Sequence, residues 1–174
     1  MYLGIDLGTG SVKALLLNAD GIVVSEASAS YPVQAPQPTW AETHPDQWWQ
    51  ATVQAVCEAT HGHDVKAIGL SGQMHGMVLI DKNLNVLRPA ILWADTRSQK
   101  QLESFRRLSK TQHRHLANPF ATGMTGVSLL WLKENELNIY QQTRWVLQPK
   151  DWLRLKLTSE VYAESSDASA TLLY

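Results

Sequence analysis

The sequence predicts an α/β domain with a mixed sheet and flanking helices. Residues 1–31 hold three short apolar runs separated by glycine-containing turns, a pattern typical of an antiparallel meander. A helical segment and a further strand follow, and the chain beyond residue 94 is mostly helical in character. With 174 residues, 44% of them hydrophobic and 18% charged, the chain is long enough for one domain with a substantial core.

The meander is predicted from the strands 2–7, 12–18 and 22–30. Apolar residues dominate the first two runs, which indicates that the strands are at least half buried. The second turn contains Asp20 and Gly21, a strong hairpin signal because both residue types tolerate positive φ. The first turn contains two glycines and is considered below as a candidate site.

A helix is expected after the proline-rich crossing at 32–38. Thr43 is a suitable N-cap, and Pro45 suits the first turn because its missing N–H would lack a helical partner there. The residues at helical spacing are expected to face the core; they are Trp49, Val53, Val56 and Thr60, with Cys57 as a small core residue beside them.

The remaining elements follow from shorter patterns. Strands are expected at 65–70, 77–80, 86–93, 145–147 and 161–163, and helical segments at 98–108, 128–135 and 151–157. A polar loop is expected at 164–170, and a new apolar element begins at 171. Because a natural chain rarely stops inside such an element, we expect this sequence to be part of a longer protein.

The charge balance excludes several classes of partner. Fifteen Lys and Arg face sixteen Asp and Glu, a formal net charge of -1, so there is no basic excess for nucleic acid and no polybasic tract for a membrane surface. No apolar run reaches the roughly 20 residues that cross a bilayer. The start of the chain lacks the positive segment of a secretory signal, and the single cysteine fits a reducing compartment. We therefore expect a cytoplasmic protein.

The sharpest local feature is the segment DLGTGSVK at 6–13. Its two glycines allow a tight turn that leaves backbone N–H groups free to contact anionic oxygens, and its threonine and serine add hydroxyl donors. A carboxylate at the end of the first strand is suited to hold Mg²⁺ through water near those oxygens. The candidate phosphate-site residues are Asp6, Gly8, Thr9, Gly10, Ser11 and Lys13.

Two familiar phosphate motifs do not match this segment. The Walker pattern requires Gly-Lys-Ser/Thr at the start of a helix, and the dinucleotide fingerprint requires a third glycine where Lys13 stands. Both continue into a helix, whereas a strand is predicted here. On the residues alone, a hairpin that merely requires glycine at its turn is an equally good interpretation.

The strand–DxGTxxxK–strand pattern resembles the first phosphate loop of the superfamily that contains actin, hexokinase and the Hsp70 ATPase. Further stretches narrow the resemblance to the FGGY carbohydrate kinases, among which the chain is most similar to the xylulokinases: PTWAETHPDQWWQA, VKAIGLSGQMHGMVLID, LRPAILWADTR, LLWLKENE, LQPKDWLRLKLTSE and SSDAS. The resemblance implies a ribonuclease H-like, actin-like ATPase domain. It makes residues 1–174 the N-terminal, sugar-binding part of a kinase whose C-terminal ATP-binding domain lies outside this chain.

The resemblance also implies an activity and roles for residues. The activity is ATP-dependent phosphorylation of a ketopentose, foremost D-xylulose to D-xylulose 5-phosphate, with ATP and Mg²⁺ as cofactors. Asp6 would position the phosphoryl group and, through water, Mg²⁺. The family's general base is an aspartate beyond Tyr174, so the chain alone is expected to be inactive. Relatives often carry a lysine where Ser128 stands, which leaves one cleft contact open. The implied sugar-binding residues are Gln73, Met74, His75, Asp95 and Arg97.

Two alternatives stay open at this point. A related kinase of ribulose, gluconate or glycerol would share the glycine turn and differ in the sugar loop. A non-catalytic actin-like module that senses sugar would keep the turn without the chemistry. Trp40 and Trp93 lie close in sequence to the cleft loops and are candidates for stacking on a sugar face. The expected partners are a small sugar and ATP, with neither nucleic acid nor a membrane, and a homodimer is left open.

Overall fold

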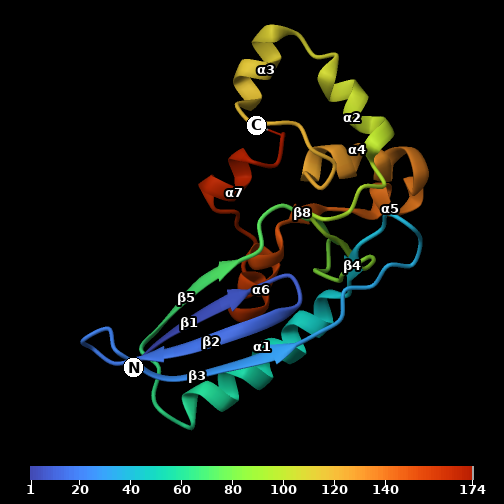
Figure 1. Cartoon of the computed structure of the whole chain (residues 1–174). Helices are drawn as coiled ribbons and strands as arrows, with labels where there is room; N and C mark the ends of the chain where they lie inside the picture. The colour runs from blue at the N-terminus through green and yellow to red at the C-terminus, as the bar shows by residue number, and fades with distance from the viewer. Residues whose placement is uncertain (174) are drawn as a thin grey trace.

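The computed structural model describes residues 1–173 and contains one main sheet with strand order β3-β2-β1-β5 (Figure 1). β1 (Tyr2–Leu7), β2 (Ser11–Leu17) and β3 (Val23–Ser30) are antiparallel neighbours. β5 (Ala67–Gly72) pairs with β1 in the parallel direction. The predicted meander and mixed sheet are confirmed, although the strand expected at 65–70 begins and ends two residues later.

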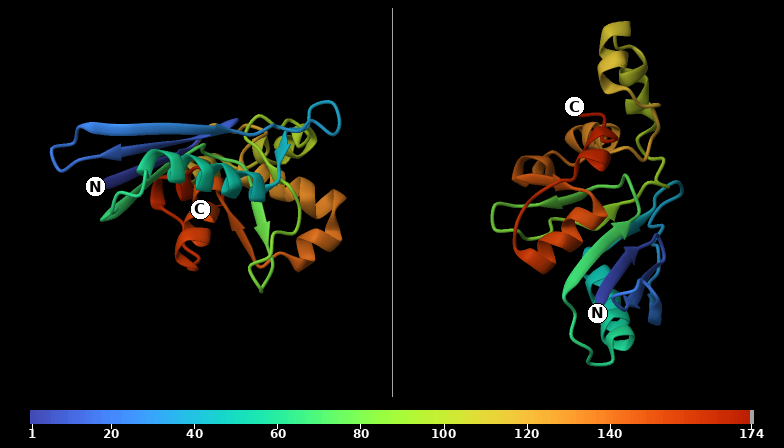
Figure 2. Two further views of the ribbon diagram at one scale, coloured as in Figure 1. Left: turned by 90° about the horizontal axis from the view of Figure 1, so that it is seen from below. Right: turned by 90° about the vertical axis from the view of Figure 1, so that its left-hand side faces the viewer.

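Two helices cover one face of this sheet. α1 (Pro45–Thr60) and α6 (Pro149–Thr158) lie on the same side, and the opposite face is open among the described residues (Figure 2). Alternate side chains of β1, β2 and β3 point toward the helices and are buried. Trp48 and Trp152 meet edge to face in this core, with ring centroids 6.0 Å apart. The period-2 burial of the strands is what the apolar runs predicted.

The predicted core face of α1 is only partly correct. Trp49 and Val56 are partly buried and pack against the core, whereas Val53 is 43% exposed and Cys57 is exposed. The fully buried residues of the helix include Trp48 and three alanines, at 51, 55 and 59. The alanines carry little side chain, so the helix backbone can approach the sheet closely along that face. The N-cap is His44, whose side chain accepts a hydrogen bond from the backbone N–H of Asp46.

Short strands extend the fold beyond the main sheet. β4 (Glu42–Thr43) pairs with β7 (Ala90–Ile91), and β6 (Val78–Ile80) pairs with β8 (Trp145–Leu147). The long strand expected at 86–93 is therefore reduced to two residues, with Val86 making an isolated bridge. Thr43, the expected N-cap of α1, lies in β4.

The remaining helices are only partly those predicted. α2 (Gln99–Arg106) and α4 (Thr125–Asn135) overlap the helices expected at 98–108 and 128–135. The helices α3 (Lys110–Leu116), α5 (Leu137–Gln142) and α7 (Ser165–Ser169) were not predicted. α7 replaces the loop expected at 164–170, and its N-cap is Glu164, whose side chain accepts a hydrogen bond from the backbone N–H of Asp167.

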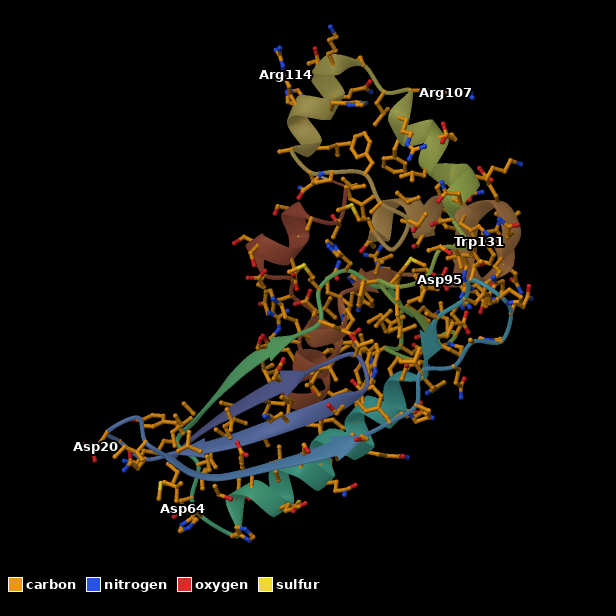
Figure 3. All side chains as sticks on the ribbon, viewed as in Figure 1. Asp20, Asp64, Asp95, Arg107, Arg114 and Trp131 are labelled. Atoms are coloured by element: carbon orange, nitrogen blue, oxygen red, sulfur yellow. The ribbon has the colours of Figure 1, made fainter. Side chains whose placement is uncertain are left out.

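The strand expected at 161–163 is not formed, since these residues are in an irregular segment between α6 and α7. α2 and α3 project away from the sheet, with Arg107 and Arg114 on this projecting part (Figure 3). No helix found in residues 1–173 has both the length and the apolar character needed to cross a membrane.

Candidate active site

The glycine turn lies where β1 passes into β2, and the sheet fixes its backbone. The N–H of Gly8 donates to the carbonyl oxygen of Ser11 at 2.9 Å. Tyr31, directly after β3, donates its N–H to the carbonyl oxygen of Gly10 at 3.0 Å and its hydroxyl to the carbonyl oxygen of Gly8. Because these contacts use the carbonyls, they hold the turn without using the N–H groups of Thr9 and Gly10.

Tyr31 is only 8% exposed. Burial, together with the negative charge of nearby Asp6, raises the pKa of its hydroxyl, so the phenol stays protonated and remains a donor. No local pattern predicts this role, because Tyr31 lies 23 residues from Gly8 and reaches the turn only through the pairing of the strands.

The predicted sugar loop follows β5 and lies beside this turn. β1 and β5 are parallel neighbours, so their carboxyl ends meet at the same edge of the sheet. The N–H of Gln73 donates to the carbonyl oxygen of Leu7 at 2.7 Å, which joins the start of the loop to the end of β1. Ligands of open α/β sheets bind at such edges.

The turn and the loop share one cleft of about 580 Å³. Its lining residues are Asp6, Gly8, Thr9, Gly72, Gln73, Met74, His75 and Trp93. Trp93 joins the two sides, because its indole N–H donates to the hydroxyl oxygen of Thr9 at 3.0 Å while its ring remains half exposed. Thus six of the predicted site residues and one of the two candidate tryptophans line one cleft, together with Gly72.

The loop presents polar atoms that have no partner among residues 1–173. Both amide atoms of the Gln73 side chain and Nδ1 of His75 are buried without a hydrogen bond. Buried polar atoms are normally paired, so these atoms are suited to a ligand rich in hydroxyl groups. His75 also has a left-handed backbone with φ of 57°, which non-glycine residues adopt infrequently.

Lys13 lies outside the residues that line the cleft, and so do Gly10 and Ser11, which belong to the same turn. Asp6 and Lys13 are direct partners in the β1–β2 ladder, so both side chains point to the open face of the sheet. The exposed Asp6 carboxylate reaches the rim of the cleft. Mg²⁺ keeps several waters and is often held by one carboxylate plus phosphate oxygens, so Asp6 fits a water-mediated Mg²⁺ contact. Residues 1–173 contain no cluster of three ligating side chains that would hold a metal without phosphate.

Asp95 and Arg97, which were expected in the cleft, are not among the residues that line it in residues 1–173. Both side chains are 1% exposed, and Nη2 of Arg97 lies 2.7 Å from Oδ2 of Asp95 and 2.6 Å from Oε1 of Glu42. Asp95 also accepts the N–H of Ala41 at 2.7 Å. The two residues therefore join the segment around 41 to the segment around 95.

Trp40 also lies outside the residues that line the cleft. The guanidinium carbon of Arg97 lies 3.5 Å from the centroid of a Trp40 ring and 5.0 Å from that of Trp131, so Trp40 stacks on a buried cation and not in the cleft. Figure 3 shows Asp95 and Trp131 near each other and far from Asp20, which lies in the turn between β2 and β3. Ser128 is buried within α4 and is also absent from the cleft lining.

The family model described as "FGGY family of carbohydrate kinases, N-terminal domain" matches residues 1–174, the whole of this chain. The chain belongs to the FGGY family of carbohydrate kinases. The resemblance stated from the sequence motifs is therefore confirmed, and the matched part is the N-terminal domain of the family.

Individual proteins similar to this chain include sugar kinases of the same family. The chain is 43% identical over 176 residues to the xylulose kinase of Klebsiella pneumoniae, covering 99% of this chain and 36% of that protein. The solved structure of a xyloylose kinase from Brucella ovis superposes with a TM-score of 0.94 at 40% identity, covering 98% of this chain and 37% of that one. The chain therefore spans little more than a third of the length of these relatives.

The fold is the actin-like ATPase fold of these sugar kinases. The gluconate kinase of Lactobacillus acidophilus matches with a TM-score of 0.93 at 24% identity, covering 99% of this chain and 36% of that one. Since a protein named for a different sugar has nearly the same backbone, the fold alone does not select the sugar.

Proposed function

We propose that the complete protein is an ATP-dependent ketopentose kinase that converts D-xylulose to D-xylulose 5-phosphate. The observation that carries the proposal is the shared cleft, in which a glycine turn suited to phosphate faces a loop with free polar atoms suited to a polyol. The 43% identity to a protein named xylulose kinase supports the choice of sugar. The proposed domain is the sugar-binding part, and ATP and Mg²⁺ are the proposed cofactors.

The sugar would bind on the loop side of the cleft. Gln73 and His75 would exchange hydrogen bonds with its hydroxyls, since their side-chain atoms have no other partner within residues 1–173. Met74, which is 58% exposed, and the indole of Trp93 would contact the apolar face of the sugar carbons. In this arrangement the loop sets which hydroxyl is turned toward the phosphate side.

The phosphoryl group would bind on the turn side. The backbone N–H groups of Thr9 and Gly10 and the hydroxyls of the turn would donate to its oxygens, and Asp6 would hold a water of a Mg²⁺ ion bound near the phosphates. Lys13 would add a positive charge on the same face of the hairpin. Phosphoryl transfer passes through a loose transition state, so position and charge stabilisation are the contributions required of these residues.

No residue of the described chain is assigned as the base that takes the proton from the attacking hydroxyl. We therefore expect negligible turnover from residues 1–174 alone, and we propose that the base and the ATP-binding domain belong to the rest of the protein. The reducing compartment implied by the single cysteine, and the requirement for ATP, support a cytoplasmic location.

A sugar panel tests the proposal directly. The complete protein is incubated with Mg·ATP and with D-xylulose, D-ribulose, D-gluconate or glycerol, and ADP formation is measured. The highest kcat/KM is expected for D-xylulose. A preference for gluconate or glycerol would contradict the choice of sugar, and binding of a sugar without phosphorylation would favour a sensing module.

Two variants separate the two sides of the cleft. Asp6→Asn should lower kcat about 100-fold or more with little change in the KM for sugar, because it removes charge placement at the phosphoryl group. His75→Ala should raise the KM for sugar about tenfold with a smaller change in kcat, which corresponds to one or two lost hydrogen bonds. An unchanged KM for sugar in the histidine variant would refute the assignment of the loop.

A further inference from the structure

A chain of buried polar side chains reaches the sugar loop from behind. The side-chain amide of Gln148 donates to the hydroxyl oxygen of Thr125 at 2.9 Å, and that hydroxyl donates to the carbonyl oxygen of Gly76 at 3.1 Å. Gln148 is 4% exposed and Thr125 is 2% exposed. Burial of polar groups costs free energy unless they are hydrogen-bonded. The hydrogen bonds that lead to the carbonyl of Gly76 therefore offset part of the cost of burying these two side chains.

Neither side chain caps the helix at whose start it lies. Thr125 is the first residue of α4 and Gln148 is the N-cap of α6, yet no side-chain capping bond is formed at either helix start. The hydroxyl and the amide are directed to each other and to the loop. Helix capping therefore does not explain them.

The loop requires such a support. His75 and Gly76 are both left-handed, with φ of 57° and 76°, and a left-handed non-glycine residue persists only where its surroundings hold it. On the far side, Met77 exchanges backbone hydrogen bonds of 2.8 and 3.1 Å with Ile91. The carbonyl that follows His75 is held by Thr125.

Packing limits the same position. A side chain at Gly76 would start 3.2 Å from the carbonyl oxygen of Ile91 and 3.3 Å from the ring of Pro149. The backbone at 76 thus lies between β7 and the start of α6. Its N–H donates to the carbonyl oxygen of Gly123 at 3.4 Å, and its carbonyl oxygen accepts the hydroxyl of Thr125, so both contacts limit rotation of the backbone here. A change in that rotation would move the neighbouring His75 side chain.

We propose that Thr125, backed by Gln148, is a positioning residue for the sugar loop, holding the carbonyl of Gly76 so that His75 keeps its left-handed conformation in the cleft. Thr125 and Gln148 are outside the cleft lining, so they act through the loop and touch no substrate. The link to sugar binding rests on the proposed kinase function, whereas the effect on the loop does not.

The test compares Thr125→Val, which keeps the shape and removes the hydroxyl, with Thr125→Ser, which keeps the hydroxyl. Hydrogen–deuterium exchange of residues 73–77 is measured in the complete protein without ligand. The valine variant should exchange about tenfold faster in this segment, the size of effect expected for one lost hydrogen bond, and the serine variant should match the wild type within about twofold. Gln148→Met, which leaves the contact from Thr125 to Gly76 in place, should accelerate exchange about threefold.

Enzyme kinetics provide the second readout. The KM for D-xylulose should rise about tenfold in Thr125→Val and return with Thr125→Ser, while the KM for ATP stays within about twofold. Unchanged exchange at 73–77 in both the valine and the methionine variants would overturn the proposal, as would equal rises in both KM values. If the wild-type protein phosphorylates no ketopentose, the kinase proposal fails, and the exchange comparison still decides the role of Thr125.

Discussion

The two walls of the cleft are held in different ways. The turn wall is part of a β-hairpin, so its main constraints come from adjacent strands and from Tyr31 at the end of the next one. The loop wall depends on contacts between distant segments. The carbonyl of Gly76 accepts the hydroxyl of Thr125, 49 residues away, and the segment that carries Trp93 is joined through Asp95 to Ala41, 54 residues from Asp95. Local sequence therefore specifies the phosphate side of the cleft, while packing of the whole domain specifies the sugar side.

Because the loop wall depends on long-range contacts, substitutions remote from the cleft should disturb the loop wall more than the turn wall. The largest effect is expected from Asp95→Ala, which leaves Arg97 buried with only part of its ionic contacts. Removing one partner of a buried ion pair typically costs about 3–5 kcal/mol of unfolding free energy. Chemical denaturation measures it.

An exposed ion pair provides the control for Asp95→Ala. Glu103 and Arg106 pair on the surface of α2, with side chains 51% and 52% exposed. Glu103→Gln should cost no more than about 0.5 kcal/mol, because solvent screens such pairs. Similar losses in the two variants would show that the Asp95–Arg97 contact does not hold the domain together.

The next effect is expected at Gly123, where a Cβ would lie 1.8 Å from the carbonyl oxygen of Trp93. Gly123→Ala must displace backbone, with a cost of about 2–3 kcal/mol, and should move Trp93 away from Thr9. Denaturation and the indole N–H signal of Trp93 in NMR spectra measure the two effects. Gly69→Ala is the control, since nothing lies within 4 Å of a Cβ there and its φ is not left-handed. An unshifted Trp93 signal would contradict the close approach of residue 123 to the backbone of Trp93.

The smallest effect is expected on the turn wall. Tyr31→Phe removes only the hydroxyl that donates to Gly8, so the loss should be about 1 kcal/mol. Because the pKa of Tyr31 is raised in the folded protein, the folded state keeps this proton after the unfolded chain has begun to lose it near pH 10. The stability due to the neutral phenol is therefore complete below that pH and is lost above it.

Thermal unfolding between pH 8 and pH 11 measures this dependence. The difference in stability between the wild type and Tyr31→Phe should shrink as the pH rises above about 10, the ordinary pKa of tyrosine. A difference that stays constant over this range would show that the phenol is not held in its neutral form.

The sequence reading succeeded where a signal was local. The alternation of apolar residues and the glycines at 8 and 10 predicted the meander and the turn, because hairpin pairing joins neighbours in the sequence. It failed for Val53 and Cys57 of α1, which are exposed, because the rule of large apolar residues at helical spacing overlooks how closely an alanine face can approach a sheet. It also failed at 161–163, where the apolar residues do not pair with any strand among residues 1–173.

The candidate site shows the same division. The residues of the turn and of the loop at 73–75 were identified from motifs, and the structure places the two segments around one cleft. Asp95 and Arg97 were expected in the cleft from the family resemblance, and the structure describes them in a buried ionic contact outside the cleft lining, which no local pattern predicts. Tyr31, Thr125 and Gln148 carry no local pattern, and their contacts exist only in the folded domain.

The proposed kinase function requires that sugar and phosphate meet in this cleft. A crystal structure of the complete protein with D-xylulose and Mg·ADP tests this directly. We expect the sugar to contact Gln73, His75 and Trp93, with one hydroxyl turned toward the glycine turn at 8–11. A sugar bound outside this cleft, or one whose hydroxyls all face away from the turn, would contradict it.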